Sequence, residues 1–535
     1  DYTNKGNLVA VISNGTAVLG LGNLGALGSK PVMEGKAVLF KRFADVNSID
    51  IELDTEDPDE FCKAVRLMGP TFGGINLEDI KAPECFIIEQ RLKEEMDIPV
   101  FHDDQHGTAV ICAAGLINAL HLSGKKIEDV KIVLNGAGAA GIACLELLKA
   151  MGARNDNCIM CDTKGVIYQG RTEGMNQWKS AHAVKTDARS LDDAMKGCDV
   201  FLGVSAKGAV TPSMVASMAD NPVIFAMANP DPEITPEEAH EVRMDAIVAT
   251  GRSDYPKQVN NVLGFPYLFR DALDIHARAI NDEMKIACAH ALANLAREDV
   301  PDEVALAYGK NLTFGRDYII PTPFDPRLIH RIPPAVAKAG MDTGAARRPI
   351  IDIKAYEESL KSRMDPTASI LRGLNTRART AQARMIFAEG DDPRALRAAV
   401  NYQRSGLGKA LVVGRQDDVK AKLEAAGLGD AVRELEVVNA ANTTHLDNYK
   451  DFLHKRLHRK GFDGADLHRL AARDRHVFAA LMLAHGHGDG VVTGATRKSA
   501  HILERLNHVV DAALEAGVAG ILALLHQCRI VLMAG

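Results

Sequence analysis

Residues 130 to 250 alternate short apolar segments with helical ones, and this alternation constrains the fold more than any other feature of the chain. Five segments are predicted to be buried strands: VKIVLN, NCIMCD, DVFLGV, PVIFAM and DAIVAT. A helix is expected from about Ala140. Parallel strands need crossover connections, which helices supply on both faces of a sheet. The sequence therefore predicts an α/β protein with a doubly wound parallel sheet in this region.

A glycine motif follows the first of these strands. GAGAAG places Gly136, Gly138 and Gly141 between a strand and a helix, the context in which a tight turn lets the backbone approach a pyrophosphate. This predicts a Rossmann-like dinucleotide-binding domain, the alternative being a turn needed only for close packing. At the end of the next strand, Asp162 favours NAD by bonding a ribose hydroxyl, whereas Lys164 suits the 2′-phosphate of NADP. The choice between the two cofactors stays open.

A second copy of the motif, GLGNLG, is interpreted differently. Gly20, Gly22 and Gly25 are followed within ten residues by two more glycines and Pro31, so we predict a substrate-side loop rather than a helix. Lys36 is then expected at the start of a strand, KAVLF.

Two acidic pairs lie 25 residues apart and are candidates for a metal site. Asp103 and Asp104 follow the predicted strand at 98–102, and Glu78 and Asp79 lie in NLEDI. Adjacent carboxylates repel each other, and a shared Mg²⁺ or Mn²⁺ would remove that repulsion. The alternative is that these residues cap helices or face solvent.

Further polar residues could complete such a site. Buried beside a metal ion, Lys36 would have a lowered pKa and could accept a hydroxyl proton, although most lysines are simply exposed. Asn229, Asn260 and Asn261 follow sheet-type segments, where their amides could hold a carboxylate or the nicotinamide ribose. The alternative for Asn229, which precedes a proline, is a turn.

The 535 residues divide into several domains. We expect a mixed domain over 1–107, the dinucleotide domain with its C-terminal helices over 108–345, a linker over 346–384, and a further α/β domain over 385–535. Irregular, Arg-rich sequence between 310 and 383 is interpreted as a connector. The first residue is Asp, and no export signal follows, so the chain is expected to be an internal portion of a longer polypeptide.

The net charge limits the kinds of partner that the protein can bind, and the cysteine content indicates its compartment. A net charge of −7 gives no broad basic surface for nucleic acid or an anionic membrane, and no apolar run reaches the length of a membrane span. Nine scattered cysteines suit a reducing cytoplasm, with Cys158 and Cys161 interpreted as core residues of a strand rather than as a zinc or redox motif.

Several stretches, taken together and in order, resemble the malic enzymes: YTNKGNLVAVISNGTAVLG, NLEDI, VFHDDQHGTA, LNGAGAAGIA, FAMANPDPEI and VNNVLGFP. The resemblance covers about residues 1–345. It implies Glu78, Asp79 and Asp104 as metal ligands with Asp103 beside them, Lys36 as the base, Asn229 and Asn261 at malate, and the glycines of GAGAAG at the cofactor. The general acid of that family is a tyrosine expected upstream of residue 1.

From residue 385 onward, RMIFAEGDDPRALRAA and GDGVVTGATR resemble the first part of a phosphotransacetylase. This order of domains resembles the bacterial hybrid malic enzymes, which implies NADP as cofactor, a homo-oligomer and regulation by acetyl-CoA. Because the second half of a phosphotransacetylase is missing, we expect sensing or assembly rather than acyl transfer. A competing hypothesis is a regulatory fragment that binds nucleotide or acyl-CoA without catalysis.

Overall fold

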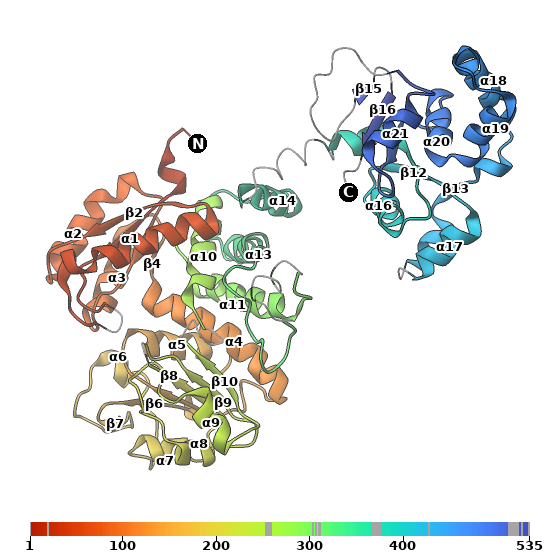
Figure 1. The fold of residues 1–535 in the computed structure, drawn as a ribbon. Coiled ribbons are helices and arrows are strands. Elements are labelled where there is room, and N and C mark those ends of the chain that lie inside the picture. The colour runs from red at the N-terminus through yellow and green to blue at the C-terminus, as the bar shows by residue number, and fades with distance from the viewer. Residues whose placement is uncertain are drawn as a thin grey trace. The chain divides into compact units, whose positions relative to one another are not determined.

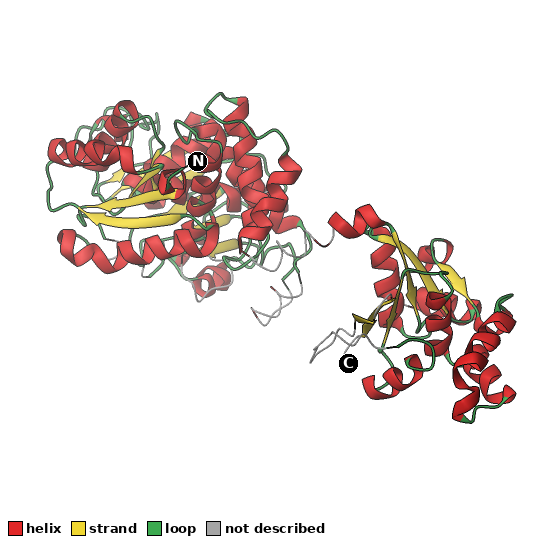
Figure 2. Ribbon diagram, turned by 90° about the horizontal axis from the view of Figure 1, so that it is seen from above, coloured by secondary structure: helices red, strands yellow, loops and turns green. Residues whose placement is uncertain are grey.

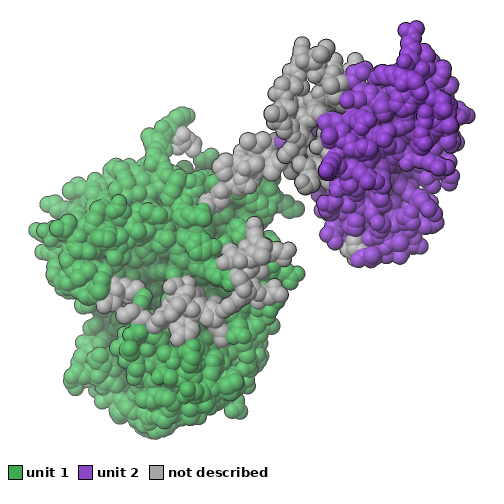
Figure 3. Space-filling model, viewed as in Figure 1, with its two compact units in different colours: residues 1–365 green, residues 366–535 purple. Residues whose placement is uncertain are grey.

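The computed structural model describes residues 2–18, 21–229, 231–251, 259–301, 304, 308, 312–364, 374, 376–425, 428–511, 524–525 and 528–532. The chain forms two compact units, residues 1–365 and 366–535, which are coloured separately in Figure 3. Helices surround two parallel or mostly parallel sheets in unit 1 and one mostly parallel sheet in unit 2 (Figure 2). The predicted α/β class is therefore confirmed.

The first sheet of unit 1 has four parallel strands in the order β2-β1-β3-β4 (Figure 1). They are β1 (Leu8–Ser13), β2 (Asn47–Glu52), β3 (Gly74–Leu77) and β4 (Val100–His102), joined by α1 (Gly25–Ala44), α2 (Pro58–Met68) and α3 (Glu84–Glu95). Leu77 pairs with His102, so the carboxyl ends of β3 and β4 meet at one edge. The residues that follow these strands are the two acidic pairs.

Helix α1 corrects the expectation of a loop and a strand over residues 25–40. Lys36 lies within this helix, and of the glycines in GLGNLG only Gly20 falls outside the described residues. The buried residues recur every three or four positions, as one helical face requires: Ala26, Ser29, Met33, Lys36, Phe40 and Ala44. Pro31 is exposed, as are the neighbouring glycines, so these helix-breaking residues lie where they disturb no packing.

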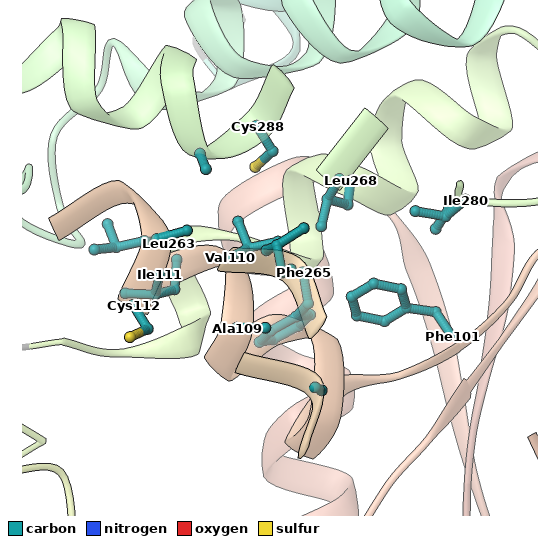
Figure 4. Packing of buried hydrophobic residues seen from close by; sticks show 14 of the residues in the cluster. Phe101, Ala109, Val110, Ile111, Cys112, Leu263, Phe265, Leu268, Ile280 and Cys288 are labelled. Atoms are coloured by element: carbon teal, nitrogen blue, oxygen red, sulfur yellow. The ribbon is translucent and has the colours of Figure 1, made fainter. Parts of the chain in front are cut away.

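A single π-helical turn, Asp103–Gly107, joins β4 to the long apolar helix α4 (Thr108–Ser123). Residues 103–123 are the only segment long and apolar enough to cross a membrane among the described residues, and 67% of that window is buried in unit 1. Phe101 and Val110, which flank this turn in sequence, belong with Phe265 to one cluster of buried hydrophobic residues (Figure 4). The turn therefore rests on the hydrophobic core.

The second sheet confirms the predicted dinucleotide-binding architecture. Its order is β10-β9-β8-β5-β6-β7, built from β5 (Ile132–Asn135), β6 (Cys158–Asp162), β7 (Gly165–Val166), β8 (Val200–Gly203), β9 (Val223–Ala226) and β10 (Ile247–Thr250). Helices α5 (Ala139–Ala150), α6 (Gln177–Ser180), α7 (Leu191–Met195), α8 (Pro212–Ala216) and α9 (Pro236–Val242) connect the strands. Cys158 and Cys161 are free and buried in β6, as expected of core residues.

Among the described residues, unit 1 continues with the helices α10 (Phe265–Asp274), α11 (Asp282–Arg297), α13 (Leu328–Asp342) and α14 (Ile353–Met364). Both α13 and α14 lie in the stretch interpreted as a connector, so that interpretation is wrong for them. The prolines of α13, Pro333 and Pro334, are buried among apolar residues that pack against the core, and this packing outweighs the cost of proline inside a helix. In α14, Tyr356 donates a hydrogen bond to Asp274.

Unit 2 contains a third sheet in the order β13-β12-β11-β14-β16-β15. Its strands are β11 (Ala383–Phe387), β12 (Gly408–Val413), β13 (Glu436–Val438), β14 (Gly490–Thr493), β15 (Leu524–Leu525) and β16 (Cys528–Leu532). Its helices are α16 (Pro393–Arg404), α17 (Gln416–Ala425), α18 (Leu446–Leu457), α19 (Gly464–Arg473), α20 (Arg475–Ala484) and α21 (Ser499–Leu506). The new α/β pattern predicted from Met385 is confirmed.

Asp271 in α10 is fully buried, and neither of its carboxylate oxygens has a hydrogen-bond partner among the described residues. Burial, followed by the charge of Asp274, raises its pKa well above the usual range. The folded chain therefore keeps a proton that the unfolded chain releases above about pH 4, and stability is lost as the pH rises.

We expect Asp271→Asn to raise the Tm at pH 8 and to flatten its decline between pH 4 and pH 8, as measured by calorimetry. Asp342→Asn, at an exposed position near the end of α13, should leave the profile unchanged. A lower Tm for Asp271→Asn than for the parent chain at pH 8 would contradict this account of Asp271.

Candidate active site

The two acidic pairs converge at the carboxyl edge of the first sheet. Ligand-type oxygen atoms of Glu78, Asp79 and Asp104 all lie within 4.8 Å of one another. The backbone N–H of Asp79, whose φ is +51°, donates a 2.7 Å hydrogen bond to Asp104 Oδ2 and ties the two loops together. Two segments that are separate in sequence thus form one cluster of carboxylates.

Lys36 projects from α1 into this cluster. Its Nζ lies 2.6 Å from Asp103 Oδ2 and 2.9 Å from Glu78 Oε1, and it sits 4.3 Å from the centre of the Phe265 ring. Burial alone would lower the pKa of Lys36, but the charges of Asp103 and Glu78 outweigh burial and hold that pKa above its ordinary value. The lowered pKa expected of Lys36 beside a bound metal ion remains a prediction.

Burial makes the charged form of these carboxylates less favourable than it is in water. Burial raises the pKa of Glu78 to about 7, that of Asp103 to about 7 and that of Asp104 to about 6. A buried group of hard oxygen ligands with excess negative charge is the donor set that Mg²⁺ and Mn²⁺ prefer. Glu78, Asp79 and Asp104 therefore fit a divalent cation.

Asp103 is placed differently from the other three acids. It pairs with Lys36 and accepts a 2.6 Å hydrogen bond from Asn261 Nδ2, and it does not belong to the group whose oxygens lie within 4.8 Å. Its Oδ1 is buried without a partner among the described residues, and a Cβ at Gly107 would lie 1.8 Å from that atom. Gly107 is thus required for this position of Asp103.

The remaining amides have different roles in the structure. Asn260 caps the 3₁₀ turn at 261–263 by accepting a hydrogen bond from the N–H of Val262. Asn229 is exposed after β9. Asn76, which the sequence analysis missed, is fully buried and donates a 2.8 Å hydrogen bond to Glu78 Oε2. Its position two residues before Glu78 was the available signal, since alternate strand residues share one face.

The glycines of GAGAAG adopt the geometry that a dinucleotide loop needs. Gly136 has φ +122°, and a Cβ there would lie 2.4 Å from the carbonyl of Val204. A Cβ at Gly141 would lie 1.9 Å from the carbonyl of Gly136, whereas Gly138 has open space around it. The N-terminus of α5 has no side-chain cap, so its backbone amides are available to a phosphate.

Asp162 lies at the end of β6, as predicted, but its carboxylate is already engaged. Arg171 and Lys179 each approach it to 2.8 Å, while Lys164 pairs with Glu173 at 2.9 Å and donates only its backbone N–H to Asp162. These cations, together with hydrogen bonds to the carboxylate, lower the pKa of Asp162 despite its partial burial, which raises it. Arg171 and Lys179 were missed because nothing in their spacing marks them as neighbours of Asp162.

The fold and the site together define a class: a dinucleotide-dependent oxidoreductase with a buried acidic cluster and a lysine beside it. Comparison with known families identifies that class more closely. The malic enzyme N-terminal domain family matches residues 1–93, and the malic enzyme NAD-binding domain family matches residues 105–308. The phosphate acetyl/butaryl transferase family matches residues 369–534.

Two relatives are similar in sequence to this chain over nearly its whole length. The NADP-dependent malic enzyme of Rhizobium meliloti is 61% identical over 535 residues, which are 100% of this chain and 70% of that protein. The NADP-dependent malic enzyme of Escherichia coli K12 is 50% identical over 496 residues, 92% of this chain and 65% of that protein. A crystal structure of malic enzyme from Pyrococcus horikoshii is 40% identical with a TM-score of 0.62, covering 70% of this chain and 86% of that one.

The chain belongs to the malic enzyme family, and it joins malic enzyme domains to a phosphotransacetylase-like domain, as the resemblance to the hybrid type implied. It spans about two thirds of the length of these curated relatives.

Proposed function

We propose that this protein catalyses the oxidative decarboxylation of (S)-malate to pyruvate and carbon dioxide with reduction of NADP, and that it depends on Mg²⁺ or Mn²⁺. The observation that carries the proposal is the convergence of Glu78, Asp79 and Asp104 beside Lys36, in a chain with a dinucleotide-binding loop. Relatives named NADP-dependent malic enzyme over 92 to 100% of the chain support it.

The acidic residues and Lys36 have separate roles in the proposed reaction. Glu78, Asp79 and Asp104 would hold the divalent ion, which supplies Lewis-acid polarisation of the C2 oxygen of the substrate. Lys36 Nζ, which must first release its ammonium proton, is the atom placed to accept the proton of the C2 hydroxyl as hydride leaves C2 for the nicotinamide. A divalent cation beside Lys36 would favour that release, because a neighbouring positive charge lowers the pKa of an ammonium group. Asp103 pairs with Lys36 and is itself held by a hydrogen bond from Asn261, so these two residues position the lysine.

The cofactor preference follows from the surroundings of Asp162. A ribose hydroxyl needs a free carboxylate there, but Arg171 and Lys179 occupy both oxygens of Asp162. Three cationic side chains at the end of β6, including Lys164, suit the extra phosphate of NADP. We therefore assign NADP as the preferred cofactor.

Lys179→Ala is expected to raise the KM for NADP by about tenfold, the effect of losing one charge-assisted contact, and to change the KM for NAD little. Initial-rate measurements with both cofactors check this expectation. Lys126→Ala, an exposed lysine in the loop before β5, serves as the matched control. Equal loss with both cofactors would contradict the assignment.

The activity itself is tested with the purified protein. Malate, NADP and Mn²⁺ should yield pyruvate and NADPH in equal amounts, and chelation of the metal should stop the reaction. Absence of turnover with a folded, metal-loaded preparation would instead favour the competing hypothesis of a regulatory fragment.

Unit 2 is assigned a regulatory and assembly role in a homo-oligomer, with acetyl-CoA as the effector. The match to the phosphate acetyl/butaryl transferase family supports this role. We also propose that the protein is cytoplasmic, because eight of its nine cysteines are buried free thiols, as a reducing compartment allows.

A further inference from the structure

Glu233 is a buried acid that has no part in the reaction described above. It lies in the loop between β9 and α9, is fully buried, and forms no ion pair among the described residues. A Cβ at Gly203 would lie 2.4 Å from the carboxyl carbon of Glu233, so the end of β8 leaves room for this group. Burial of a carboxylate without a cation is costly, and the hydrogen bonds around it must offset that cost.

The carboxylate of Glu233 joins the loops that follow β8 and β9. In the first loop, the backbone N–H and the hydroxyl of Ser205 donate hydrogen bonds to Oε1 at 2.7 and 3.0 Å. In the second loop, the backbone N–H of Ala228 donates a hydrogen bond to Oε2 at 3.1 Å. Burial raises the pKa of Glu233, and these hydrogen bonds oppose that rise. Because all three partners are donors, the ionised carboxylate suits this position.

The loop that follows β5 is attached to the same point. Asn135 Nδ2 donates a 2.9 Å hydrogen bond to the hydroxyl oxygen of Ser205, which leaves the hydroxyl proton for Glu233. The next residue, Gly136, packs so closely on the carbonyl of Val204 that a Cβ would lie 2.4 Å from its oxygen. One buried carboxylate thus fixes the relative positions of three loops at the carboxyl edge of the second sheet.

Two of these loops lie where the nicotinamide half of a dinucleotide is expected. The strand order reverses between β5 and β8, and dinucleotides bind across the crevice at such a reversal. The GAGAAG loop suits the pyrophosphate, and Asp162 after β6 lies on the side of the adenosine ribose. The ends of β8 and β9 are left for the nicotinamide, and there Ser205 and Asn229 are exposed although Glu233 is buried.

We propose that Glu233 is a positioning residue for the nicotinamide half of the cofactor. By joining the loops after β8 and β9, it holds Ser205 and Asn229 at the edge of the sheet where the nicotinamide binds. Glu233 acts through these loops and touches no reacting atom. The inference rests on the cofactor use in the proposed function, but binding of the cofactor requires no turnover of malate.

Calorimetric titration with NADPH and, separately, with adenosine 2′,5′-bisphosphate, the adenosine half alone, tests this inference. Glu233→Gln keeps the size of the side chain, but its amide has a single acceptor oxygen, so its NH₂ group must face a donor on one of the two loops. We expect the affinity for NADPH to fall about tenfold or more, the effect of losing one charge-assisted hydrogen bond. The affinity for adenosine 2′,5′-bisphosphate should stay unchanged.

A milder variant and a matched control accompany this substitution. Ser205→Ala removes the hydroxyl that links Asn135 to Glu233 but keeps the backbone N–H, so it should weaken NADPH binding less. In the double variant, the losses in binding free energy should sum to less than the two single losses, because both substitutions alter one connection. Glu241→Gln, at an exposed position of α9, should bind both ligands like the parent chain.

The two titrations separate positioning from a general structural role. Equal weakening of NADPH and adenosine 2′,5′-bisphosphate in Glu233→Gln would mean that the residue supports the domain as a whole, and this would overturn the inference. Unchanged NADPH binding in both Glu233→Gln and Ser205→Ala would overturn it as well. A parent chain that binds NADPH but does not oxidise malate would count against the proposed function alone.

Discussion

Lys36→Ala is expected to lower kcat for malate by about 10²- to 10⁴-fold, the range that a positioned general acid–base group contributes. The reason is that Lys36 Nζ is the described basic atom that lies within 2.9 Å of both acidic loops. The KM for NADP should change little, because the GAGAAG loop and the end of β6 make no use of this side chain. Steady-state kinetics with saturating Mn²⁺ measure both quantities.

A structural role for Lys36 must be separated from a chemical one. Removing the ammonium leaves Asp103 and Glu78 buried without their cation, which costs stability. Thermal unfolding should therefore accompany the kinetics, and Lys36→Met, which keeps the side-chain volume, should be equally inactive. Partial rescue of the alanine variant by added methylamine would show that the amine itself is needed, whereas full activity of either variant would refute the assignment.

Asp104→Asn is expected to weaken Mn²⁺ binding by at least about 100-fold, because loss of a direct ligand should exceed the 10- to 100-fold effect of changing a residue that only supports one. Its carboxylate also accepts the N–H of Asp79, and an amide can keep that hydrogen bond through its oxygen. The substitution therefore removes charge with little change of shape. Titration monitored by electron paramagnetic resonance of Mn²⁺ measures the affinity directly.

Asp129→Asn, an exposed residue before β5, is the matched control and should bind Mn²⁺ like the parent chain. Asp103→Asn should be intermediate, since Asp103 pairs with Lys36 and Asn261 and stands apart from the three-acid group. Unchanged Mn²⁺ affinity in Asp104→Asn would rule out Asp104 as a ligand.

The meeting of the acidic pairs could be predicted from the sequence for a physical reason. Both pairs directly follow apolar strands, and neighbouring parallel strands end at the same edge of a sheet. The glycine loop was predictable for a similar reason, since GAGAAG lies between a clear strand and a clear helix. In both cases the functional residues directly follow a strand in the sequence, so the strand pattern also locates the site.

Other features depended on tertiary packing and were misread or missed. Helix α1 was hidden because Gly28, Pro31 and Gly35 mark a loop, although all three lie on its exposed face and the core side keeps helical spacing. Helix α13 was hidden by two prolines that are buried in the core, and helix α14 by its many polar residues. The contact of Arg171 with Asp162 forms only in the folded chain, and no pattern in the sequence marks the two residues as neighbours.

The most direct test of the account is a crystal structure of the protein soaked with Mn²⁺, read from the anomalous scattering of the metal. We expect one strong peak within about 2.0–2.6 Å of carboxylate oxygens of Glu78, Asp79 and Asp104, with Lys36 beside it. A peak located elsewhere, or no peak at this cluster at millimolar Mn²⁺, would contradict the claim that two separate loops form one metal site.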